Sequence, residues 1–371
     1  MTGQHDRFCL LATSRPMKAV VTTGVGGLER LEYRDVPVPA VGPNDVLIRV
    51  SAAALNSVDV NTRLGWYAPG VTVATADLEG APPDPDRADS GWDEPTPFPL
   101  IQGADCCGTV AELGSRAPAE LRGRRVVVRP CMRPSGFGEL RTAWLGSDCD
   151  GAFAQYVKAP ASEVFPVDAD LTDVELAALP CAYGTAENLL QRAGVAGGER
   201  VLVTGASGGV GTALMQLATA RGATVIATTS RGKCEAVRAL GAELAVASDA
   251  DPAGEIGRST LDVVIDNVSG PGFAALLGLL RRGGRYATCG AIAGPLVAFD
   301  KRTLYLRDLT IIGCTAWDEP VFPAVLAAVA RGEVRPPIDA TYALGEMAAA
   351  QTRLLERRHI GKIVVVPPAA D

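Results

Sequence analysis

The feature that most restricts the fold of this chain is an alternation of short apolar runs and helical segments over residues 200–315. Five runs are almost entirely apolar, and three segments among them carry apolar residues at helical spacing. The runs read VLVTG, TVIATTS, LDVVIDNV, RYATCG and LTIIGCT, and the helical segments read GGVGTALMQLATARG, GKCEAVRALGA and GFAALLGLLRRGG. Strands that are apolar on both faces are typical of a parallel sheet covered by helices on both sides. The sequence therefore predicts an α/β fold with a doubly wound, right-handed parallel sheet.

A glycine-rich turn joins the first apolar run to the first helical segment, in VLVTGASGGVGTALMQLA. Dinucleotide-binding turns occur in this strand–turn–helix context. In the G-x-G-x-x-G pattern Ala206 takes the first position, Gly208 the second and Gly211 the third. Gly208 would let the backbone approach a pyrophosphate, Gly211 would let helix and strand pack closely, and free amides at the helix N-terminus would bind the anion. We predict a Rossmann-type sheet, with an ordinary βα turn as the alternative, and a cofactor-binding turn comprising Ala206, Ser207, Gly208, Gly209, Val210 and Gly211.

The end of the second predicted strand indicates which dinucleotide binds. NAD-binding folds place Asp or Glu about 20 residues after the glycine turn, where this chain has Thr229. Ser230, Arg231 and Lys233 follow, with no carboxylate among them. Hydroxyl groups and cations suit a 2′-phosphate, which a carboxylate would repel. We predict NADPH, bound by these four residues; the alternative is that Arg231 and Lys233 only lie on a solvated loop.

Composition excludes several classes of function. The 371 residues include two histidines, His5 and His359, near opposite ends of the chain, so neither a Ser-His-Asp triad nor a His-rich metal site is expected. A net charge of −7 disfavours nucleic acid as a partner. No apolar run approaches the roughly 20 residues that span a membrane. Nine cysteines, an odd number without a secretory signal, are typical of reduced thiols in the cytoplasm.

The rest of the chain predicts a second region of short strands. Residues 17–49 and the runs GTVAEL, RRVVVRP and GAFAQYVKAP have the pattern of antiparallel β structure. We expect residues 1–16 to be a loose extension, residues 68–100 to be a loop insertion without helix or strand, and residues 131–149 to be an irregular lobe. ELAALPCAYGTAENLLQRAG predicts one helix ending at Gly194, and two helices and the strand KIVVVP close the chain.

From Met17 onward the sequence resembles the medium-chain dehydrogenase/reductase superfamily. The resemblance rests on MKAVV, DVLIRVSAAALNSVD, GRRVVV, GAFAQYV, ELAALPCAYGTA, the glycine turn and HIGKIVVV. It implies an N-terminal, mostly antiparallel β (GroES-like) catalytic domain of residues 17–165 and 318–371. Residues 166–317 would form the NADP-binding Rossmann domain.

In the zinc alcohol dehydrogenases of this superfamily three positions hold the catalytic metal. Here they are Asn56 in LNSVD, Ala104 in GAD and Cys181 in LPCAYGT. One thiolate out of three cannot hold Zn²⁺ tetrahedrally with an open site. The structural zinc of such enzymes has four closely spaced cysteines, whereas this lobe has Cys131 and Cys149. We therefore predict no metal, and we interpret Cys181 as a small buried packing residue.

Without zinc, the chain resembles the quinone oxidoreductase branch, which reduces quinones or α,β-unsaturated carbonyls with NADPH. The resemblance places Asn56 beside the nicotinamide, Asp59 beside the active site and Tyr67 in the wall of the cleft. Hydride transfer leaves negative charge on the acceptor's oxygen, so hydrogen-bond donors are needed. We expect Asn56, Ser57 and Tyr67 to donate, and Tyr67 or solvent to supply the proton. Wall packing for Tyr67 and a structural hydrogen bond for Asp59 are the alternatives.

Ligands of a doubly wound sheet bind beyond the carboxyl ends of its strands. Residues that follow LDVVID, RYATCG and LTIIGCT are therefore expected to border the ribose and nicotinamide. Lys362, in HIGKIV, lies in a segment that the family brings toward the cofactor, or else at a solvated strand end. The predicted cofactor set is completed by Thr185, Asn267, Val268, Gly290, Ala291, Thr315 and Lys362.

Three functions fit these observations: a zinc-free NADPH-dependent reductase of quinones or α,β-unsaturated carbonyls, an alcohol or aldehyde dehydrogenase of a biosynthetic pathway, and a non-catalytic NADPH-binding protein. The resemblance also implies a homodimer that extends the cofactor sheet across a two-fold axis. Residues 308–317 (DLTIIGCTAW) are apolar and β-prone, as such an edge requires. A proline at Ile312 is predicted to break the dimer; a monomer shielded by its own C-terminal helices is the alternative.

Overall fold

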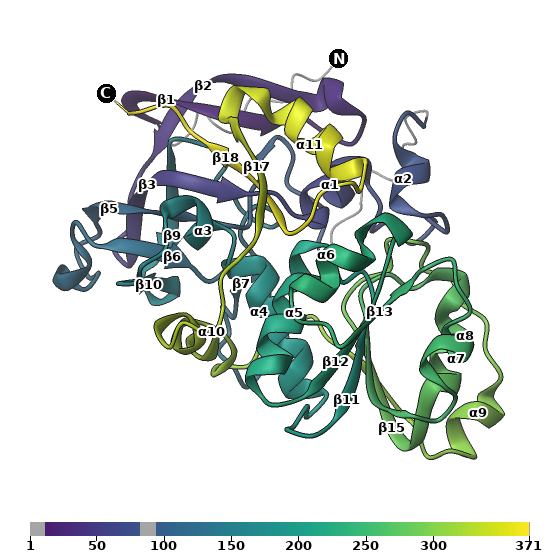
Figure 1. Cartoon of the computed structure of the whole chain (residues 1–371). Helices are drawn as coiled ribbons and strands as arrows, with labels where there is room; N and C mark the ends of the chain where they lie inside the picture. Colours follow the sequence, from purple (N-terminus) through teal and green to yellow (C-terminus); the bar gives the residue numbers. More distant parts are fainter. Residues whose placement is uncertain (1–11, 82–93, 371) are drawn as a thin grey trace. The chain divides into compact units, whose positions relative to one another are not determined.

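The computed structural model of the chain describes residues 12–81 and 94–370, and the chain divides into two compact units (Figure 1). Unit 1 comprises residues 1–71, 79–181 and 338–371, and unit 2 comprises residues 72–78 and 182–337. The chain therefore changes units at 181/182 and 337/338, whereas the sequence placed the boundaries at 165/166 and 317/318.

Packing explains why both boundaries lie later in the chain than the sequence predicted. Helix α3 (Asp173–Ala177) contacts strands β3 (Asp45–Ala54) and β5 (Cys107–Leu113), which keeps it in unit 1. Helix α10 (Val321–Ala330) belongs to unit 2, because its Phe322 stacks on Trp317.

Unit 1 is built from short, mostly antiparallel strands, as expected for a GroES-like domain. One sheet has the order β2-β1-β4, a second has the order β10-β6-β5-β3-β18-β17 with β9 also pairing with β3, and β7 pairs with β8. The strand bounds are β1 Ala12–Thr22, β2 Leu31–Pro39, β4 Leu100–Ile101, β6 Arg125–Val128, β7 Cys131–Met132, β8 Ala143–Trp144, β9 Tyr156–Pro160, β10 Val164–Pro166, β17 Ile338–Ala343 and β18 Lys362–Val366, besides β3 and β5.

The pairing of β18 with β3 matters most for function. These strands are antiparallel, with Val364 opposite Ala54 and Val365 opposite Ala53. The register brings Lys362, at the start of β18, to the end of β3, where the chain turns into helix α1 (Ser57–Leu64). Besides α1 and α3, unit 1 contains helix α11 Met347–Leu355 and the 3-10 helices η2 Leu28–Arg30, η4 Ala119–Leu121, η5 Ala161–Glu163 and η8 Leu344–Glu346.

Three predictions for residues 1–149 need correction. The strand β1 begins at Ala12, which pairs with Pro39, so residues 12–16 are not a loose extension; residues 1–11 lie outside the described residues. The insertion of residues 68–100 contains a short helix, α2 (Thr75–Leu78), and ends in strand β4, while residues 82–93 lie outside the described residues. The lobe of residues 131–149 is not wholly irregular, because β7 and β8 pair within it.

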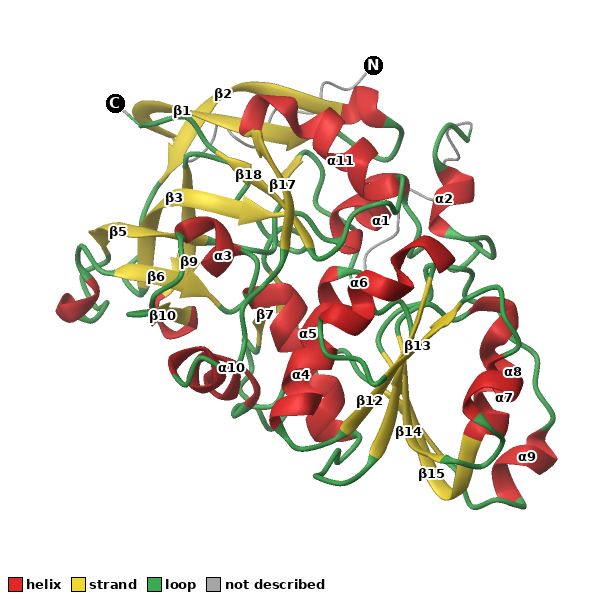
Figure 2. Cartoon of the chain, viewed as in Figure 1, coloured by secondary structure: helices red, strands yellow, loops and turns green. Residues whose placement is uncertain are grey.

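Unit 2 contains the predicted doubly wound sheet. All of its neighbouring strands are parallel, in the order β13-β12-β11-β14-β15-β16. Helices α4, α5 and α6 lie on one side of this sheet, and α7, α8 and α9 lie on the other (Figure 2). The bounds are β11 Arg200–Val203, β12 Thr224–Thr229, β13 Leu244–Ala247, β14 Leu261–Asp266, β15 Leu280–Thr288, β16 Thr310–Gly313, α5 Gly209–Ala220, η6 Arg231–Lys233, α6 Cys234–Ala239, α7 Pro252–Ile256, η7 Gly270–Gly272, α8 Phe273–Leu279 and α9 Lys301–Tyr305.

Some predicted elements of residues 172–288 have different bounds in the structure. The helix expected before Gly194 is two helices, α3 and α4 (Pro180–Arg192), because Pro180 cannot continue the first one. Strand β15 begins at Leu280, so the two arginines and two glycines after α8 belong to the strand rather than to the helix. The pattern also missed strand β13, which forms one edge of the sheet.

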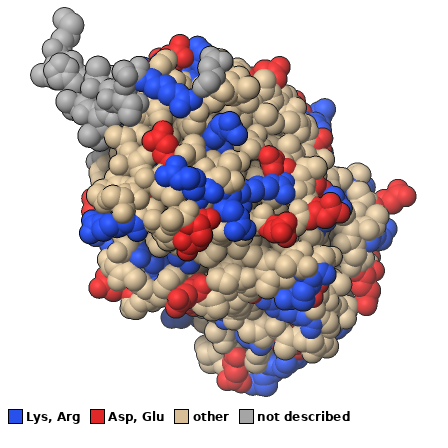
Figure 3. All heavy atoms as spheres, turned by 90° about the vertical axis from the view of Figure 1, so that its left-hand side faces the viewer, with Lys and Arg blue, Asp and Glu red and all other residues tan. Residues whose placement is uncertain are grey.

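The surface carries charges of both signs. On the face shown in Figure 3, Lys and Arg side chains are interspersed with Asp and Glu side chains. In the part of the chain that is described, no helix is long and apolar enough to cross a membrane.

Candidate active site and cofactor turn

The turn from β3 into α1 carries two residues that the sequence placed in the active site, Asn56 and Asp59. Asn56 is the N-cap residue of α1, in extended conformation, and Asp59 is the third residue of the helix. The Asp59 carboxylate accepts a hydrogen bond from the backbone N–H of Asn56 at 2.7 Å. This bond satisfies a helix N-terminal amide that the helix itself leaves unpaired. The structural hydrogen bond considered for Asp59 is therefore present.

Burial gives Asp59 an unusual acidity. Its carboxyl is buried, and the loss of solvation raises its pKa to about 7. The backbone N–H groups of Asn56 and Gly103 and the Lys362 ammonium oppose this shift, whereas the Asp105 carboxylate adds to it.

Asn56 also belongs to a buried polar cluster with two residues far away in the sequence, Asp105 and Lys362. The Lys362 ammonium donates to Asn56 Oδ1 at 2.5 Å and to Asp105 Oδ2 at 2.9 Å. Asn56 Nδ2 donates to the same Asp105 oxygen at 2.9 Å. The Lys362 side chain is 4% exposed and that of Asp105 is fully buried. We call these three residues the Lys362 cluster.

The geometry of this cluster changes the expected role of Asn56. Its amide has two N–H bonds, which point to Asp105 and, at 3.3 Å, to the carbonyl of Ala54. Its oxygen accepts from Lys362. Asn56 therefore has no N–H left to donate to a substrate unless one of these bonds breaks, contrary to the expectation from the sequence.

The structure decides one of the two alternatives for Lys362. The residue is buried in unit 1 beside Asn56 and is not at a solvated strand end, while its place in the cofactor set stays a prediction. The sequence does not predict Asp105, the partner of Lys362, because the family resemblance assigns a role only to Ala104 in the GAD segment. The signal that could have revealed it is an acidic residue beside a lost metal position, together with a lysine in a strand-forming segment.

The other two predicted catalytic residues lie on or just after α1. Ser57 is exposed at the first position of the helix. Tyr67 is half-buried beyond the end of the helix, and its hydroxyl accepts a hydrogen bond from Asn61 at 3.4 Å. Its ring meets that of Trp66 edge to face. The donor roles of Ser57 and Tyr67 and the wall position of Tyr67 stay predictions.

A buried arginine anchors the helix that carries these groups. Arg63, near the end of α1, is fully buried and donates to Gln351 of α11 at 2.8 Å, to the carbonyl of Gly26 at 2.8 Å and to Glu79 at 2.9 Å. Three elements of unit 1 thus hold α1 in place from its far end.

The three positions that hold zinc in related alcohol dehydrogenases do not fit a metal here. Asn56 is committed to hydrogen bonds, Ala104 has no donor atom, and Cys181 is a buried thiol whose backbone N–H donates to Asp105 at 2.6 Å. The neighbouring cation is the Lys362 ammonium, which repels a metal ion. Over residues 12–81 and 94–370, no three His, Cys, Asp or Glu side chains are grouped so as to hold a metal.

In unit 2, the glycine turn adopts the strand–turn–helix geometry predicted from the sequence. Gly208 is the N-cap of α5, and the amides of the following turn, from Gly209 to Gly211, form the helix N-terminus. A Cβ at Gly211 would lie 2.3 Å from the carbonyl oxygen of Gly205 and 2.6 Å from Cα of Ala206. Gly211 thus allows the close approach expected of the third glycine. Gly205, which the template does not include, is the residue with positive φ, at 60°.

The end of β12 supplies polar groups beside this turn. Thr229 is buried, and its hydroxyl has no hydrogen-bond partner among the described residues. Lys233 donates to the hydroxyl of Ser207, in the glycine turn, at 3.3 Å. Arg231 is exposed and pairs with Asp249 at 2.9 Å. The unpaired Thr229 hydroxyl and the Lys233 ammonium fit a ribose that carries a phosphate group. Ser230, which follows Thr229, is exposed.

At the carboxyl end of β14, the buried carboxylate of Asp266, which the sequence did not predict as a site residue, orders the predicted cofactor loop. Asp266 accepts from the Thr204 hydroxyl at 2.6 Å and from the backbone N–H of Val268 at 3.0 Å. Thr204 in turn accepts from the backbone N–H of Asn267 at 2.9 Å. Tyr286 also donates to Asp266. Asn267 and Val268 are therefore fixed beside the glycine turn.

Four other residues of the predicted cofactor set also lie in unit 2. Thr185 is half-buried in α4. Gly290 and Ala291 are half-buried after β15, where the Thr288 hydroxyl donates to the carbonyl of Gly290 at 3.2 Å. Thr315 is exposed after β16. Their contact with the cofactor stays a prediction.

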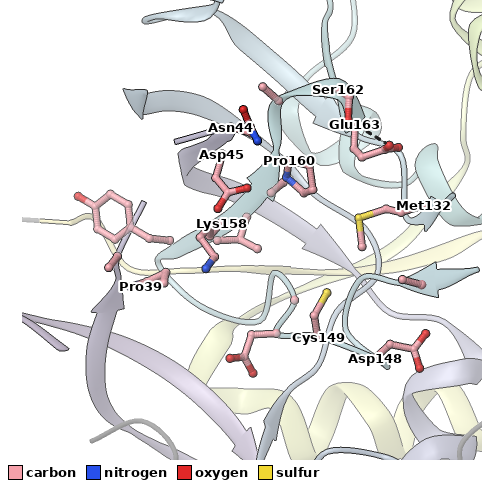
Figure 4. Close-up of a pocket in the computed structure, with 18 of the residues that line it drawn as sticks. Pro39, Asn44, Asp45, Met132, Asp148, Cys149, Lys158, Pro160, Ser162 and Glu163 are labelled. Atoms are coloured by element: carbon pink, nitrogen blue, oxygen red, sulfur yellow. Dashed lines mark hydrogen bonds between the residues drawn. The ribbon is translucent and has the colours of Figure 1, made fainter. Parts of the chain in front are cut away.

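A pocket of about 1180 Å³ in unit 1 contains none of the predicted site residues. Its wall includes Asp45 and Lys158 of the β3–β9 region and Cys149 of the lobe (Figure 4). Charges of both signs line it, and Glu163 is already paired with Arg129 at 2.6 Å.

Two families of known proteins match this chain, one in each part of it. The family described as "Alcohol dehydrogenase GroES-like domain" matches residues 42–169, and the family described as "Zinc-binding dehydrogenase" matches residues 209–331. Together the two matches cover most of the chain.

Individual relatives extend over almost the whole chain. A structure from Sinorhizobium meliloti 1021, assigned as an alcohol dehydrogenase, is 40% identical, with a TM-score of 0.85, and the match covers 96% of this chain and 98% of that one. Acryloyl-coenzyme A reductase of Sulfurisphaera tokodaii is 29% identical over 95% of this chain and 100% of its own length. The 2-octenoyl-CoA carboxylase reductase CinF, in a structure with NADP and 2-octenoyl-CoA, is 26% identical with a TM-score of 0.81, covering 97% and 90% of the two chains.

The fold, the glycine turn and these matches define the class of protein. The chain belongs to the medium-chain dehydrogenase/reductase superfamily. It is an oxidoreductase of that superfamily, whose members use nicotinamide cofactors.

Proposed function

We propose that the protein uses NADPH, without a metal, to reduce an α,β-unsaturated carbonyl compound or a quinone. The observation that carries this proposal is the donor set at the family's metal positions. These positions hold one thiol, an amide engaged in hydrogen bonds and an alanine, and the buried ammonium of Lys362 lies beside them. Reduction of a conjugated carbonyl requires charge stabilisation at an oxygen, which hydrogen-bond donors and an ammonium supply.

The preference for NADPH is supported by the groups at the end of β12. Thr229, Ser230 and Lys233 form a set without a carboxylate, and the buried Thr229 hydroxyl has no partner among the described residues. Arg231 is bound to Asp249, but both side chains are exposed. Such surface pairs contribute about 0–1 kcal/mol, so Arg231 can exchange Asp249 for a 2′-phosphate at little cost. When bound, NADPH would supply a hydride to the acceptor and leave as NADP⁺.

Relatives support the class of acceptor. Acryloyl-coenzyme A reductase and the octenoyl-CoA reductase CinF are named for α,β-unsaturated thioesters. Their substrates share a carbonyl conjugated to a C=C bond. In the proposed reaction Ser57 and Tyr67 would donate to the acceptor's oxygen, and Tyr67 or solvent would supply the proton.

An alcohol dehydrogenase is the second candidate, because an alcohol dehydrogenase structure is 40% identical in sequence to this chain.

The test measures turnover of quinones, enones, enals and simple alcohols, with NADPH and NADH for the acceptors and with NADP⁺ and NAD⁺ for the alcohols. The protein is purified without chelator, and its zinc content is measured. We expect NADPH oxidation with the conjugated acceptors at substoichiometric zinc, with at least tenfold preference over NADH. Stoichiometric zinc with alcohol oxidation would support the second candidate. No turnover with any acceptor would support a non-catalytic NADPH-binding protein.

Assembly and location complete the proposal. We propose that two copies pair through β16, the last strand in the order of the unit 2 sheet. Exposed apolar side chains of Leu296, Tyr305, Leu306 and Ile311 occur in the loop and helix before this strand and in the strand itself. Among the described residues, none of the eight cysteines is in a disulfide, which supports the cytoplasm as the proposed location.

A further inference from the structure

The Lys362 ammonium has one N–H bond that its two protein acceptors do not use. An ammonium carries three N–H donors. Among the described residues, one bond goes to Asn56 Oδ1 and one to Asp105 Oδ2. The third remains available to a ligand, although the side chain is 96% buried. A buried cation with a spare donor is costly unless its surroundings compensate it, and here Asp105 supplies the opposite charge.

The groups around the ammonium hold it rigidly. Asp105 Oδ1 accepts from the backbone N–H of Cys181 at 2.6 Å, and its Oδ2 accepts from both Asn56 and Lys362. Asn56 is fixed by its own bonds to Asp105 and to the carbonyl of Ala54. Two of the three positions that hold zinc in related enzymes, Asn56 and Cys181, are thus joined through Asp105 to the ammonium. A fixed charge of this kind stabilises a developing anion without reorganising.

We propose that Lys362 takes the place of the metal ion and polarises the acceptor's carbonyl oxygen through its third N–H; this inference rests on the proposed function. Addition of the hydride at the β-carbon forms a C–H bond, breaks the C=C π bond and moves its electron pair toward the carbonyl oxygen. The acceptor gains two electrons, which NADPH loses. The ammonium stabilises the resulting enolate oxygen, and a proton from solvent then adds to the α-carbon to give the saturated carbonyl compound.

The test removes the buried pair as a unit. Lys362→Met alone would leave the Asp105 carboxylate buried without a partner, which destabilises a fold strongly. The double variant Asp105→Asn/Lys362→Met removes both charges. Lys18→Met/Asp35→Asn is the matched control, because Lys18 and Asp35 form an exposed pair at 2.8 Å in the same unit.

Two acceptors distinguish a catalytic role from a structural one. A simple enone depends strongly on polarisation of its carbonyl, whereas a quinone depends on it less, because its reduction restores an aromatic ring. We expect kcat with the enone to fall on the order of 100-fold in the double variant, as after loss of an oxyanion donor, and kcat with the quinone to fall much less. NADPH affinity, measured by its fluorescence, should stay unchanged. Equal losses for both acceptors, or no loss, would overturn the role of Lys362.

A spectroscopic readout separates this inference from the proposed function. Carbonyl-¹³C cinnamaldehyde is bound to the NADP⁺-loaded protein, which cannot transfer hydride, and its C=O stretching frequency is measured by infrared difference spectroscopy. We expect a lower frequency than in water for wild type and for the control variant, and a return toward the value in water for the double variant. An unchanged frequency in the double variant contradicts the inference even if the enzyme is active. A shifted frequency without any turnover would contradict the proposed function instead.

Discussion

At the scale of single residues, the buried carboxylates Asp59 and Asp105 lie near each other but have different surroundings. Asp105 is compensated by the Lys362 ammonium at 2.9 Å. Asp59 has backbone N–H groups as its donors, and burial raises its pKa to about 7. Desolvation thus outweighs the hydrogen bonds that favour the charged carboxylate.

The pH dependence of stability follows from this shift. The folded pKa of Asp59, about 7, lies above its ordinary value of 3.8, so the folded chain binds the proton more tightly than the unfolded chain. The stabilisation from this proton is complete below pH 4 and is lost as the pH rises to 7. In Asp59→Asn this loss is absent. We expect the free energy of unfolding of wild type, relative to Asp59→Asn, to fall by a few kcal/mol between pH 4 and 7 in urea titrations. A constant difference over this range would contradict the raised pKa.

We expect the Arg231 guanidinium to contact the 2′-phosphate of NADPH. Replacement by Ala should raise KM for NADPH by about tenfold, because about 1.4 kcal/mol corresponds to a factor of ten and a charge-assisted hydrogen bond contributes as much. KM for NADH should stay nearly the same, since NADH has no 2′-phosphate. Arg302→Ala is the matched control, because Arg302 is also exposed and paired with an aspartate at 2.6 Å. Equal changes for the two cofactors would show that Arg231 does not contact the 2′-phosphate.

Single residues also show what the sequence could and could not predict. Asn56 and Asp59 could be selected as site candidates because they lie three positions apart in a recognisable segment; the structure adds that both are buried. Asp105 and the burial of Lys362 were not predicted, because the pair is separated by 257 residues and depends on the pairing of β18 with β3. The saturation of the Asn56 amide was also unpredictable, since it depends on the positions of individual N–H bonds.

At the scale of elements, the glycine turn combines two separate requirements. Gly211 is needed for packing, because a Cβ there would lie 2.3 Å from a backbone oxygen of Gly205. At Gly208 the nearest atom to a Cβ would be 3.6 Å away, which is an ordinary contact. Its φ of −80° also suits any residue. Gly208 is thus not required by the fold itself, which leaves close approach of a pyrophosphate as its proposed role.

Two alanine substitutions test this separation. Gly211→Ala should lower the free energy of unfolding by about 1–3 kcal/mol, as other overpacking substitutions do, because the atoms it meets are backbone and cannot rotate away. Gly208→Ala should leave stability nearly unchanged and weaken NADPH binding. Chemical denaturation and fluorescence titration measure the two effects. A destabilised Gly208→Ala, or a fully stable Gly211→Ala, would contradict this division.

The sequence pattern predicted elements well where apolar periodicity is strong. Strands β11, β12, β14 and β16 and helix α5 follow directly from it. The pattern did not predict the break at Pro180 that separates α3 from α4. It also did not predict the short strand β13, whose neighbours in the sequence include acidic residues. Short strands of this kind become distinguishable only through their partners in the sheet.

At the scale of the whole molecule, β16 ends the order of the unit 2 sheet, and the directions of its N–H groups define a test of pairing. The N–H of Cys314 donates to the carbonyl of Thr288 in β15 at 2.9 Å. Because N–H directions alternate along a strand, the N–H of Ile312 also faces β15, and those of Ile311 and Gly313 face away. A proline at Ile312 would therefore also disrupt the sheet within one chain, so this substitution does not test the dimer contact by itself.

Ile311→Pro is the better test of the proposed homodimer. It removes an outward donor at an exposed position, where Ile311 is 40% exposed, and spares the bond to β15. We expect wild type to have about twice the chain mass of 38.4 kDa by light scattering and the variant to have the mass of one chain, with an unchanged circular dichroism spectrum. Wild type at the mass of one chain would contradict the dimer.

The measurement that tests the proposed chemistry most directly is the transfer of deuterium to the product by metal-depleted protein. The chain is treated with a chelator until zinc is substoichiometric, and NADPH labelled with deuterium at the transferable C4 position is added with a conjugated enal. Mass spectrometry then locates the label in the product. We predict the saturated aldehyde with one deuterium at the β-carbon, formed at the rate of untreated protein. An unlabelled β-carbon, or activity that appears only when zinc is restored, would contradict metal-free hydride transfer to a conjugated carbonyl.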